Sequence, residues 1–376
     1  MGVEMKRLAT ALVLGTLGMA AMGVHALETG MVYPPRGSVP LHTPSRIAYA
    51  LDNNHAATSL YQWPGVYFEG NFAGQYVTVK LNDTVNKLAI YVDGNRVRDL
   101  VRPGNIAVRL GPYSDGQHTI RLEKLSETQA GVANFIGFFP DSPHPSTLPS
   151  LARNKRIEFI GDSYTAGYGN TSLKHDCTKE EIWATTDSQQ AFGPLTAKHY
   201  DADYQINAYS GIGIVRNYDG VAPGHVMPKL YPMGTFDQKD GDSRYYGNWD
   251  PQIVVIALGG NDFSTPVHAG DKWATLEDLR ADFIASYVAF VKQVRANHPK
   301  AQFILLDYGE DEVGKDVAEV IKRLNADGET RVMPFSTGGG FEQTGCDWHL
   351  STNDDKRISA SLITFIDAHP DLWNGQ

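Results

Sequence analysis

The stretch that decides the fold is residues 156–169, RIEFIGDSYTAGYG. Its first five residues form a short, mainly apolar run, which predicts a buried strand, and a Gly-rich turn follows. Ser163 is therefore expected just beyond the carboxyl end of a strand. The segment is not a Gly-x-Ser-x-Gly nucleophile elbow, because Thr165 occupies the last of those positions. Ser163 is either an activated nucleophile or, with Asp162, a cap on the segment that follows.

The rest of the chain after residue 169 alternates between strand and helix patterns. The run at 253–258 is apolar throughout, as expected of a strand that is buried on both faces. Alternation of this kind predicts a parallel sheet covered by helices, with its sites beyond the carboxyl ends of the strands. The further predicted elements are a helix at 276–298, a strand at 302–306, a helix at 315–325, a short strand at 330–334 and a helix at 351–369.

The first half of the chain has a different rhythm. Short segments alternate apolar and polar side chains or are rich in aromatic and branched residues, and turn pairs such as Asp93-Gly94 separate them. Strands at this spacing without long helical patterns predict a β-sandwich of the jelly-roll type. The predicted strands are 65–72, 76–81, 88–92, 118–125 and 135–139.

Four regions follow from these patterns. Residues 1–26 have the pattern of a signal peptide: Lys6 and Arg7, an apolar run, and then a small-x-small site that ends at Ala26. The alternative is an uncleaved anchor. Four prolines within 140–149 predict an extended connector. We therefore expect a signal peptide at 1–26, a sandwich domain at 27–140, a linker at 141–150 and an α/β domain at 151–376, in a protein that is secreted or periplasmic and has no membrane contact after cleavage.

Composition limits the partners. The 376 residues include 33 Lys and Arg against 43 Asp and Glu, a formal net charge of -10. This balance argues against nucleic acid as a partner, whereas a neutral polysaccharide meets no repulsion. Nothing in the sequence requires more than a monomer. Cys177 and Cys346 are the two cysteines, and in an oxidising compartment they can pair. A zinc site formed by the two cysteines is poorly supported, because no Cys-x-x-Cys or His-x-x-x-His spacing accompanies them.

Three further segments carry candidate polar groups, two of them at positions where strands are expected to end. Asn261 follows the buried run at 253–258, and its amide can donate to developing negative charge; the simpler alternative is an Asn-Asp turn. Gly211 lies in a Gly-rich turn after a predicted strand and can offer a backbone N–H. His349 precedes the last predicted helix, where it can accept the serine proton, unless it is simply a surface histidine.

Ser163, Gly211, Asn261 and His349 occur in the order of the four blocks of the SGNH (GDSL-like) hydrolases, which the second half of the chain therefore resembles. This implies a flavodoxin-like sheet. Nearly the whole mature chain resembles carbohydrate esterase family 2, on the motifs Gly116-x-His118-x-x-x-Leu122-x-Lys124 with Glu127 nearby, Gly-Asp-Ser with Gly167-Tyr168-Gly169, Asn261-Asp262-Phe263-Ser264 and Cys346-Asp347-Trp348-His349. The resemblance implies deacetylation of xylan or glucomannan, with the sugar 6-position favoured.

One departure from the superfamily concerns the last block, which is usually Asp-x-x-His but is Asp347-x-His349 here. Either the Asp347 carboxylate orients the imidazole and completes a triad, or a backbone carbonyl orients it and the pair is a Ser-His dyad. We favour participation of Asp347.

The resulting mechanism gives each residue a role. Ser163 attacks the acetyl carbonyl while His349 takes its proton, and the N–H groups of Ser163 and Gly211 with the Asn261 amide hold the oxyanion. No metal or organic cofactor is required. A Cys177–Cys346 disulfide would fix the two loops that flank the site. The weaker candidates for substrate contact are Asp162, Tyr218 and Trp348.

Two other functions use the same residues. A lipase or thioesterase would share the catalytic set but would need an apolar acyl pocket. A carbohydrate-binding protein without activity would rely on the sandwich domain, although the intact Ser, Asn and His argue against it.

Overall fold

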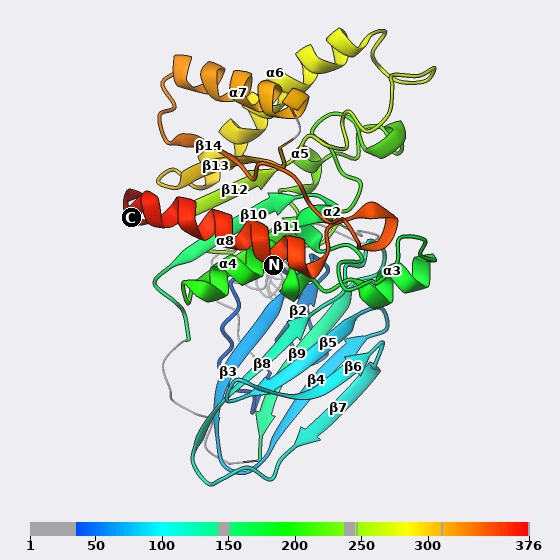
Figure 1. Ribbon diagram of the computed structural model, residues 1–376. Coiled ribbons are helices and arrows are strands. Elements are labelled where there is room, and N and C mark those ends of the chain that lie inside the picture. Colours follow the sequence, from blue (N-terminus) through cyan, green and yellow to red (C-terminus); the bar gives the residue numbers. More distant parts are fainter. Residues whose placement is uncertain (1–34, 142–150, 237–244, 246, 310, 375–376) are drawn as a thin grey trace, which may run out of the picture.

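The computed structural model describes residues 35–141, 151–236, 245, 247–309 and 311–374. The predicted signal peptide and all but the first residue of the predicted linker lie outside the described residues. The described chain folds into an antiparallel sandwich followed by an α/β domain (Figure 1).

The sandwich contains two antiparallel sheets. Their strand orders are β1-β2-β9-β4-β7 and β3-β8-β5-β6, so strands that are close in sequence repeatedly lie in opposite sheets, which is the jelly-roll connectivity predicted from the sequence. The strands are β1 Ala48–Leu51, β2 Ala57–Tyr61, β3 Tyr67–Ala73, β4 Val77–Asp83, β5 Lys87–Val92, β6 Asn95–Val101, β7 Gly104–Leu110, β8 Gln117–Lys124 and β9 Ala133–Pro140.

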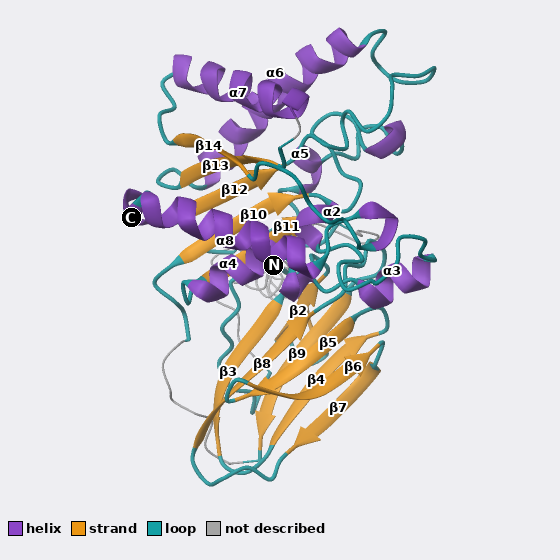
Figure 2. Ribbon diagram, in the orientation of Figure 1, coloured by secondary structure: helices purple, strands orange, loops and turns teal. Residues whose placement is uncertain are grey.

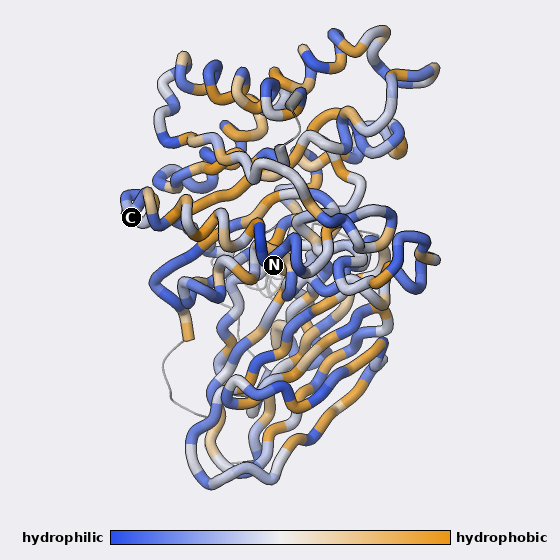
Figure 3. The backbone as a smooth tube through the Cα atoms, viewed as in Figure 1, coloured by the Kyte–Doolittle hydropathy of each residue, from blue (hydrophilic) through white to orange (hydrophobic). Residues whose placement is uncertain are grey.

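Alternation of side chains explains these strands. In β4, Val77, Val79 and Leu81 are fully buried, while the residues between them are partly exposed. The edge strand β6 buries only Leu100, and the sequence patterns therefore did not predict it. Hydrophilic and hydrophobic segments accordingly alternate along the sandwich strands (Figure 3).

The α/β domain contains a five-stranded parallel sheet. Its order, β11-β10-β12-β13-β14, is the flavodoxin-like order expected from the resemblance. After β10 the chain adds β11 on one side and then crosses to add β12 on the other side of β10, so the strand order reverses at β10. The strands are β10 Arg156–Gly161, β11 Asp203–Ala208, β12 Ile253–Ala257, β13 Gln302–Asp307 and β14 Val332–Ser336.

Helices cover both faces of this sheet, as Figure 2 shows. In β12, Val255 packs with the core beneath α4 and α8, whereas Val254 and Ile256 pack with the core beneath α6 and α7. Burial on both faces explains the continuous apolar run of this strand. The helices are α2 Ser163–Ala166, α3 Lys179–Thr185, α4 Phe192–His199, α5 Met227–Leu230, α6 Leu276–Asn297, α7 Asp311–Ala326 and α8 Thr352–Ala368.

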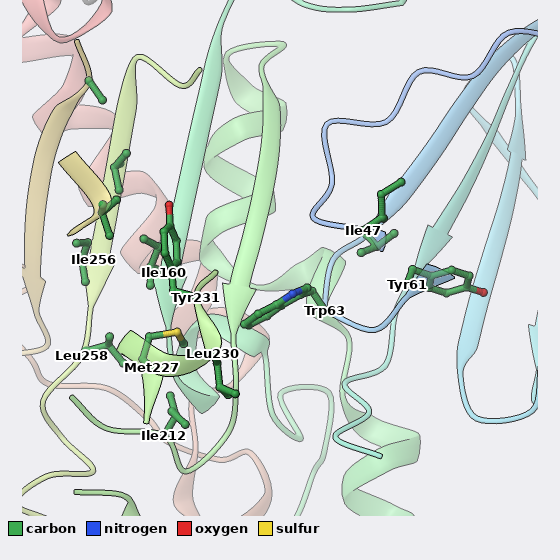
Figure 4. Packing of buried hydrophobic residues seen from close by; sticks show 14 of the residues in the cluster. Ile47, Tyr61, Trp63, Ile160, Ile212, Met227, Leu230, Tyr231, Ile256 and Leu258 are labelled. Carbon is green, nitrogen blue, oxygen red and sulfur yellow. The ribbon is translucent and has the colours of Figure 1, made fainter. Parts of the chain in front are cut away.

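One of the two hydrophobic clusters contains residues of both halves of the chain. Trp63, which follows β2, is fully buried; its indole N–H donates to the carbonyl of Met233 at 3.0 Å, and its ring packs 5.0 Å from that of Phe236. Figure 4 shows the cluster running from Tyr61 and Trp63 to residues of the α/β domain. The sandwich is therefore packed on the catalytic half rather than tethered to it. Among the described residues, no helix is long and apolar enough to cross a membrane.

Candidate active site

Ser163 begins the short helix α2 directly after β10, next to the position where the strand order reverses. Gly161 is required at the strand end, because a Cβ there would lie 2.0 Å from Thr165 Oγ1. Asp162 caps the helix, and its Oδ1 accepts the N–H of Tyr164 at 3.1 Å. This turn places the Ser163 hydroxyl at the carboxyl edge of the sheet, where ligands bind in folds of this class.

His349 contacts Ser163 directly. The imidazole Nε2 lies 2.9 Å from Ser163 Oγ, and Nδ1 faces the backbone carbonyls of Cys346 and Asp347 at 3.0 and 3.2 Å. Carbonyl oxygens only accept hydrogen bonds, so Nδ1 carries the proton. Nε2 then carries a free lone pair, which can accept the serine proton. The geometry is that of a nucleophile with its general base.

The Asp347 carboxylate does not occupy the place of a triad acid. Its Oδ2 accepts the Tyr168 hydroxyl at 2.9 Å, and the side chain is exposed. Asp347 and Trp348 both have positive φ, 51° and 57°, in the turn that precedes His349. This turn directs the carboxylate outward and the main-chain carbonyls toward Nδ1. The structure therefore corrects the expectation that Asp347 orients the imidazole, and the arrangement is a Ser-His dyad.

The surroundings of His349 determine its protonation state. The Tyr168 ring lies 4.3 Å from the imidazole and the Tyr164 ring 5.5 Å from it. Burial lowers the pKa of His349 below its ordinary value. The hydrogen bonds to the carbonyls of Asp347 and Cys346, together with the negative charge of the Asp347 carboxylate, oppose this effect only in part. The imidazole is consequently neutral, and available as a base, at neutral pH.

Two backbone N–H groups are available to an oxyanion. Within the described part of the chain, the N–H groups of Ser163 and Gly211 have no hydrogen-bond acceptor. Gly211 has φ of 82°, which is accessible to glycine without strain. Donors without an acceptor at a strand edge are suited to hold developing negative charge.

The Asn261 amide already has acceptors in this structure. Its Nδ2 donates to Asp162 Oδ2 at 3.1 Å and to the carbonyl of Ile212 at 2.9 Å. Both oxygens of Asp162 thus serve the protein, one capping α2 and one holding Asn261, which differs from the expected contact of Asp162 with substrate. Asn261 can reach an oxyanion only by sharing an amide hydrogen.

The two aromatic candidates for substrate contact are exposed. Tyr218 is 56% exposed, and its N–H donates to the carbonyl of Gly211 at 2.9 Å. Trp348 is 60% exposed and stacks on His175, with the ring planes within 6°. One lies beside the proposed oxyanion donor and the other beside the base, so both adjoin the reacting centre.

Cys177 and Cys346 form a disulfide. The bond joins the segment between α2 and α3 to the turn that carries His349. The same two segments are linked by backbone hydrogen bonds from Cys346 N–H to the Gly169 carbonyl at 3.3 Å and from Asp347 N–H to the His175 carbonyl at 2.8 Å. Covalent and hydrogen-bonded links together hold the His349 turn against the loop that follows Ser163.

Some contacts of the site were not foreseen. Tyr168 entered the sequence analysis only as part of the Gly167-Tyr168-Gly169 motif, yet its ring packs on His349 and its hydroxyl donates to the Asp347 carboxylate. Glu127 and Gln129 of the sandwich contact Ser210, beside Gly211. Glu127 carried a weak signal through the family motif; Gln129 carried none, because the contact joins residues 81 positions apart.

Comparison with known proteins identifies relatives over almost the whole described chain. The family model described as the carbohydrate esterase 2 N-terminal domain matches residues 51–147, and that of the GDSL-like lipase/acylhydrolase family matches residues 159–370. An acetylxylan esterase / glucomannan deacetylase from Cellvibrio japonicus is 43% identical over 339 residues, covering 89% of this chain and 92% of the relative.

Solved structures agree with this match. A carbohydrate esterase, described as having an active site with divergent catalytic and non-catalytic binding functions, superposes with a TM-score of 0.82 at 42% identity, covering 89% of this chain and 99% of that one. A family two carbohydrate esterase from Clostridium thermocellum in complex with cellohexaose has a TM-score of 0.75 at 27% identity, covering 89% of this chain and 100% of that one.

Proposed function

Because the chain belongs to carbohydrate esterase family 2, and is therefore a carboxylic ester hydrolase, we propose that it removes O-acetyl groups from plant cell-wall polysaccharides. The substrates are acetylated xylan or glucomannan, with the sugar 6-position favoured. Support comes from the Cellvibrio japonicus relative, whose name states both activities.

The observation that carries this proposal is the 2.9 Å contact between Ser163 Oγ and His349 Nε2, beside backbone N–H groups that have no acceptor among the described residues. Oγ attacks the acetyl carbonyl carbon while its proton passes to Nε2. The carbonyl oxygen becomes an oxyanion held by the N–H groups of Ser163 and Gly211. His349, now cationic, is stabilised through Nδ1 by the carbonyls of Cys346 and Asp347.

Collapse of the tetrahedral intermediate breaks the bond to the sugar oxygen. His349 returns its proton to that oxygen, so the sugar leaves as a neutral alcohol and an acetyl group remains on Ser163. A water molecule then loses a proton to Nε2 and attacks the acetyl carbonyl. Acetate leaves, and the proton returns to Ser163 Oγ.

Asn261 is proposed as the third oxyanion donor through a shared hydrogen. Its Nδ2 already donates to Asp162 and Ile212, so one of those hydrogens must be bifurcated as the oxyanion forms. The Asp162 carboxylate keeps the amide nitrogen, rather than its oxygen, directed into the site. Loss of the amide is expected to slow turnover by roughly 100-fold.

Substrate contact is proposed for Tyr218 and Trp348. Aromatic faces pack on the C–H surfaces of sugars, and both rings are exposed beside the site. The cellohexaose complex of the Clostridium thermocellum relative supports a glycan ligand for this class of protein.

The proposed location is outside the cytoplasm, either in the periplasm or in the medium, as a monomer. The apolar run within residues 8–23 after Lys6 and Arg7 supports export, and the Cys177–Cys346 bond suits an oxidising compartment.

The test measures acetate released from acetylated glucomannan and from acetylated xylan by the wild type and by Ser163→Ala. The proposal predicts release by the wild type and almost none by the variant. Failure on both polymers, with hydrolysis of longer acyl esters, would identify a lipase or thioesterase. Folded wild-type protein that hydrolyses no ester would leave a carbohydrate-binding role.

A further inference from the structure

Ser210, the residue before Gly211, is held by the sandwich domain. Its N–H donates to Glu127 Oε1 at 2.7 Å and its hydroxyl donates to Glu127 Oε2, while its carbonyl accepts Gln129 Nε2 at 2.9 Å. Glu127 and Gln129 belong to the loop between β8 and β9. All three polar groups of one active-site residue are therefore bound by the other domain.

The carbonyl contact bears directly on Gly211. The Ser210 carbonyl and the Gly211 N–H belong to one planar peptide unit, and in a trans peptide they point in opposite directions. Fixing the carbonyl toward Gln129 therefore fixes the N–H on the other side, toward the site. The Ser210–Gly211 peptide is the middle peptide of a turn that the Ile212 N–H closes onto the Tyr209 carbonyl at 3.1 Å. Without the Gln129 contact this peptide could flip, because glycine adopts φ of either sign.

The β8–β9 loop is built to hold this position. Ser126 and Thr128 bond inward to Asn86 of the sandwich, at 3.2 and 2.7 Å, whereas Glu127 and Gln129 bond outward to Ser210. Along this loop, alternate residues therefore bond to the sandwich and to Ser210 of the catalytic domain.

Opposing effects act on the Glu127 carboxyl group. Burial raises the pKa of Glu127, and the hydrogen bonds from Ser210 and the nearby Lys124 ammonium oppose that rise. Lys124 is itself fully buried, and its Nζ donates to the carbonyl of Gln62 at 2.6 Å.

We propose that Glu127 and Gln129 are positioning residues for the oxyanion hole, so that the sandwich completes the active site by orienting the Gly211 N–H. This rests on the proposed function, in which Gly211 is an oxyanion donor. The sandwich then acts on the chemical step in addition to any contact with the polysaccharide.

The test measures kcat and KM for an aryl acetate with full-length Gln129→Ala, Glu127→Ala and Glu127→Gln. Groups that act on the oxyanion act in the transition state, so kcat should fall about 10-fold or more, with little change in KM. Glu127→Gln keeps an acceptor for the Ser210 N–H and should recover most of the loss. The acid limb of the pH profile should not move, since His349 is untouched.

The matched control is Lys87→Met, which removes another side-chain hydrogen bond from the sandwich to the α/β domain, to the Ala184 carbonyl at 2.6 Å, without touching Ser210 or the β8–β9 loop. Its kcat should stay close to wild type. The proposal is overturned if Lys87→Met loses as much kcat as Gln129→Ala, or if Gln129→Ala and Glu127→Ala both keep wild-type kcat. Wild type and Ser163→Ala in the same assay separate this failure from that of the proposed function, because an inactive wild type or an active Ser163→Ala would instead remove the nucleophile assignment.

Discussion

At the scale of single residues, His349 is oriented by main-chain carbonyls, and the Asp347 carboxylate bonds to Tyr168 instead. We therefore expect Asp347→Asn to lower kcat by no more than several-fold, whereas loss of a true triad carboxylate costs about 10⁴-fold. Tyr168→Phe is the control, since it removes the same hydrogen bond but keeps the ring on His349. Steady-state kinetics with an aryl acetate measures both, and a thousand-fold loss in Asp347→Asn alone would restore the triad.

The ionisation of His349 sets the pH dependence. The neutral imidazole is the active base, and burial lowers its pKa. The base therefore stays neutral at pH values where an ordinary histidine is already protonated, and activity is lost only as pH falls through the lowered pKa. A profile of kcat/KM should place the midpoint of the acid limb below the ordinary histidine pKa of about 6.5. A midpoint above that value would contradict the burial argument.

At the scale of elements, the His349 turn depends on close contact with the loop after Ser163. Gly169 has φ of 57°, and a Cβ there would lie 2.5 Å from the Cβ of Cys346. Gly169→Ala must therefore displace the turn that supplies the carbonyl to Nδ1, and kcat for an aryl acetate should fall at least 10-fold.

Gly104→Ala in β7 is the matched control for that prediction. Gly104 also has positive φ, 74°, but a Cβ there meets no atom within 4 Å. It should cost about 1 kcal/mol of unfolding free energy through backbone strain and leave kcat unchanged. Equal losses of kcat in the two variants would show that the collision with Cys346 does not matter.

Elements with strong periodicity could be predicted, and those made by tertiary contact could not. The apolar run at 253–258 and the helix pattern at 276–298 correspond to β12 and α6. Helix α4 was not foreseen, because it contains Gly193 and Pro194; the glycine is needed where the helix approaches Phe159, 3.0 Å from a would-be Cβ.

The residues of the site also divide into those that the sequence predicts and those whose roles depend on tertiary contacts. Ser163, His349 and Gly211 were predicted from their positions after strands and before a helix together with their order, which resembles that of the SGNH hydrolases. The structure brings them together at one edge of the sheet. The role of Asp347 was not predictable, because it depends on two consecutive residues with positive φ. The contacts of Glu127 and Gln129 depend on the packing of one domain on the other.

At the scale of the whole molecule, Arg46 links the sandwich segment to the catalytic sheet. Its guanidinium donates to Glu158, to Asn207 and to the carbonyl of Tyr231, and the side chains of Arg46 and Glu158 are 4% and 0% exposed. Arg46→Met should lower the unfolding free energy by about 3 kcal/mol, because it leaves a buried carboxylate with fewer partners. Calorimetry should show one transition that shifts as a unit, and two separate transitions would contradict a shared core.

Arg102 provides the control, since it also joins the sandwich to a glutamate of the α/β domain. Its pair with Glu180 is in solvent, with side chains 41% and 63% exposed. Water and salt screen such a pair, so Arg102→Met should leave the melting temperature nearly unchanged. A shift as large as that of Arg46→Met would show that burial is not the source of the difference.

The most direct measurement is peptide mass mapping of wild-type protein quenched during turnover of an acetyl ester. The expected result is an acetyl group on the peptide that contains Ser163, absent from Ser163→Ala, because the contact of 2.9 Å with His349 activates that hydroxyl. Acetylation of another residue, or rapid hydrolysis by Ser163→Ala, would contradict the assignment of Ser163 as the nucleophile.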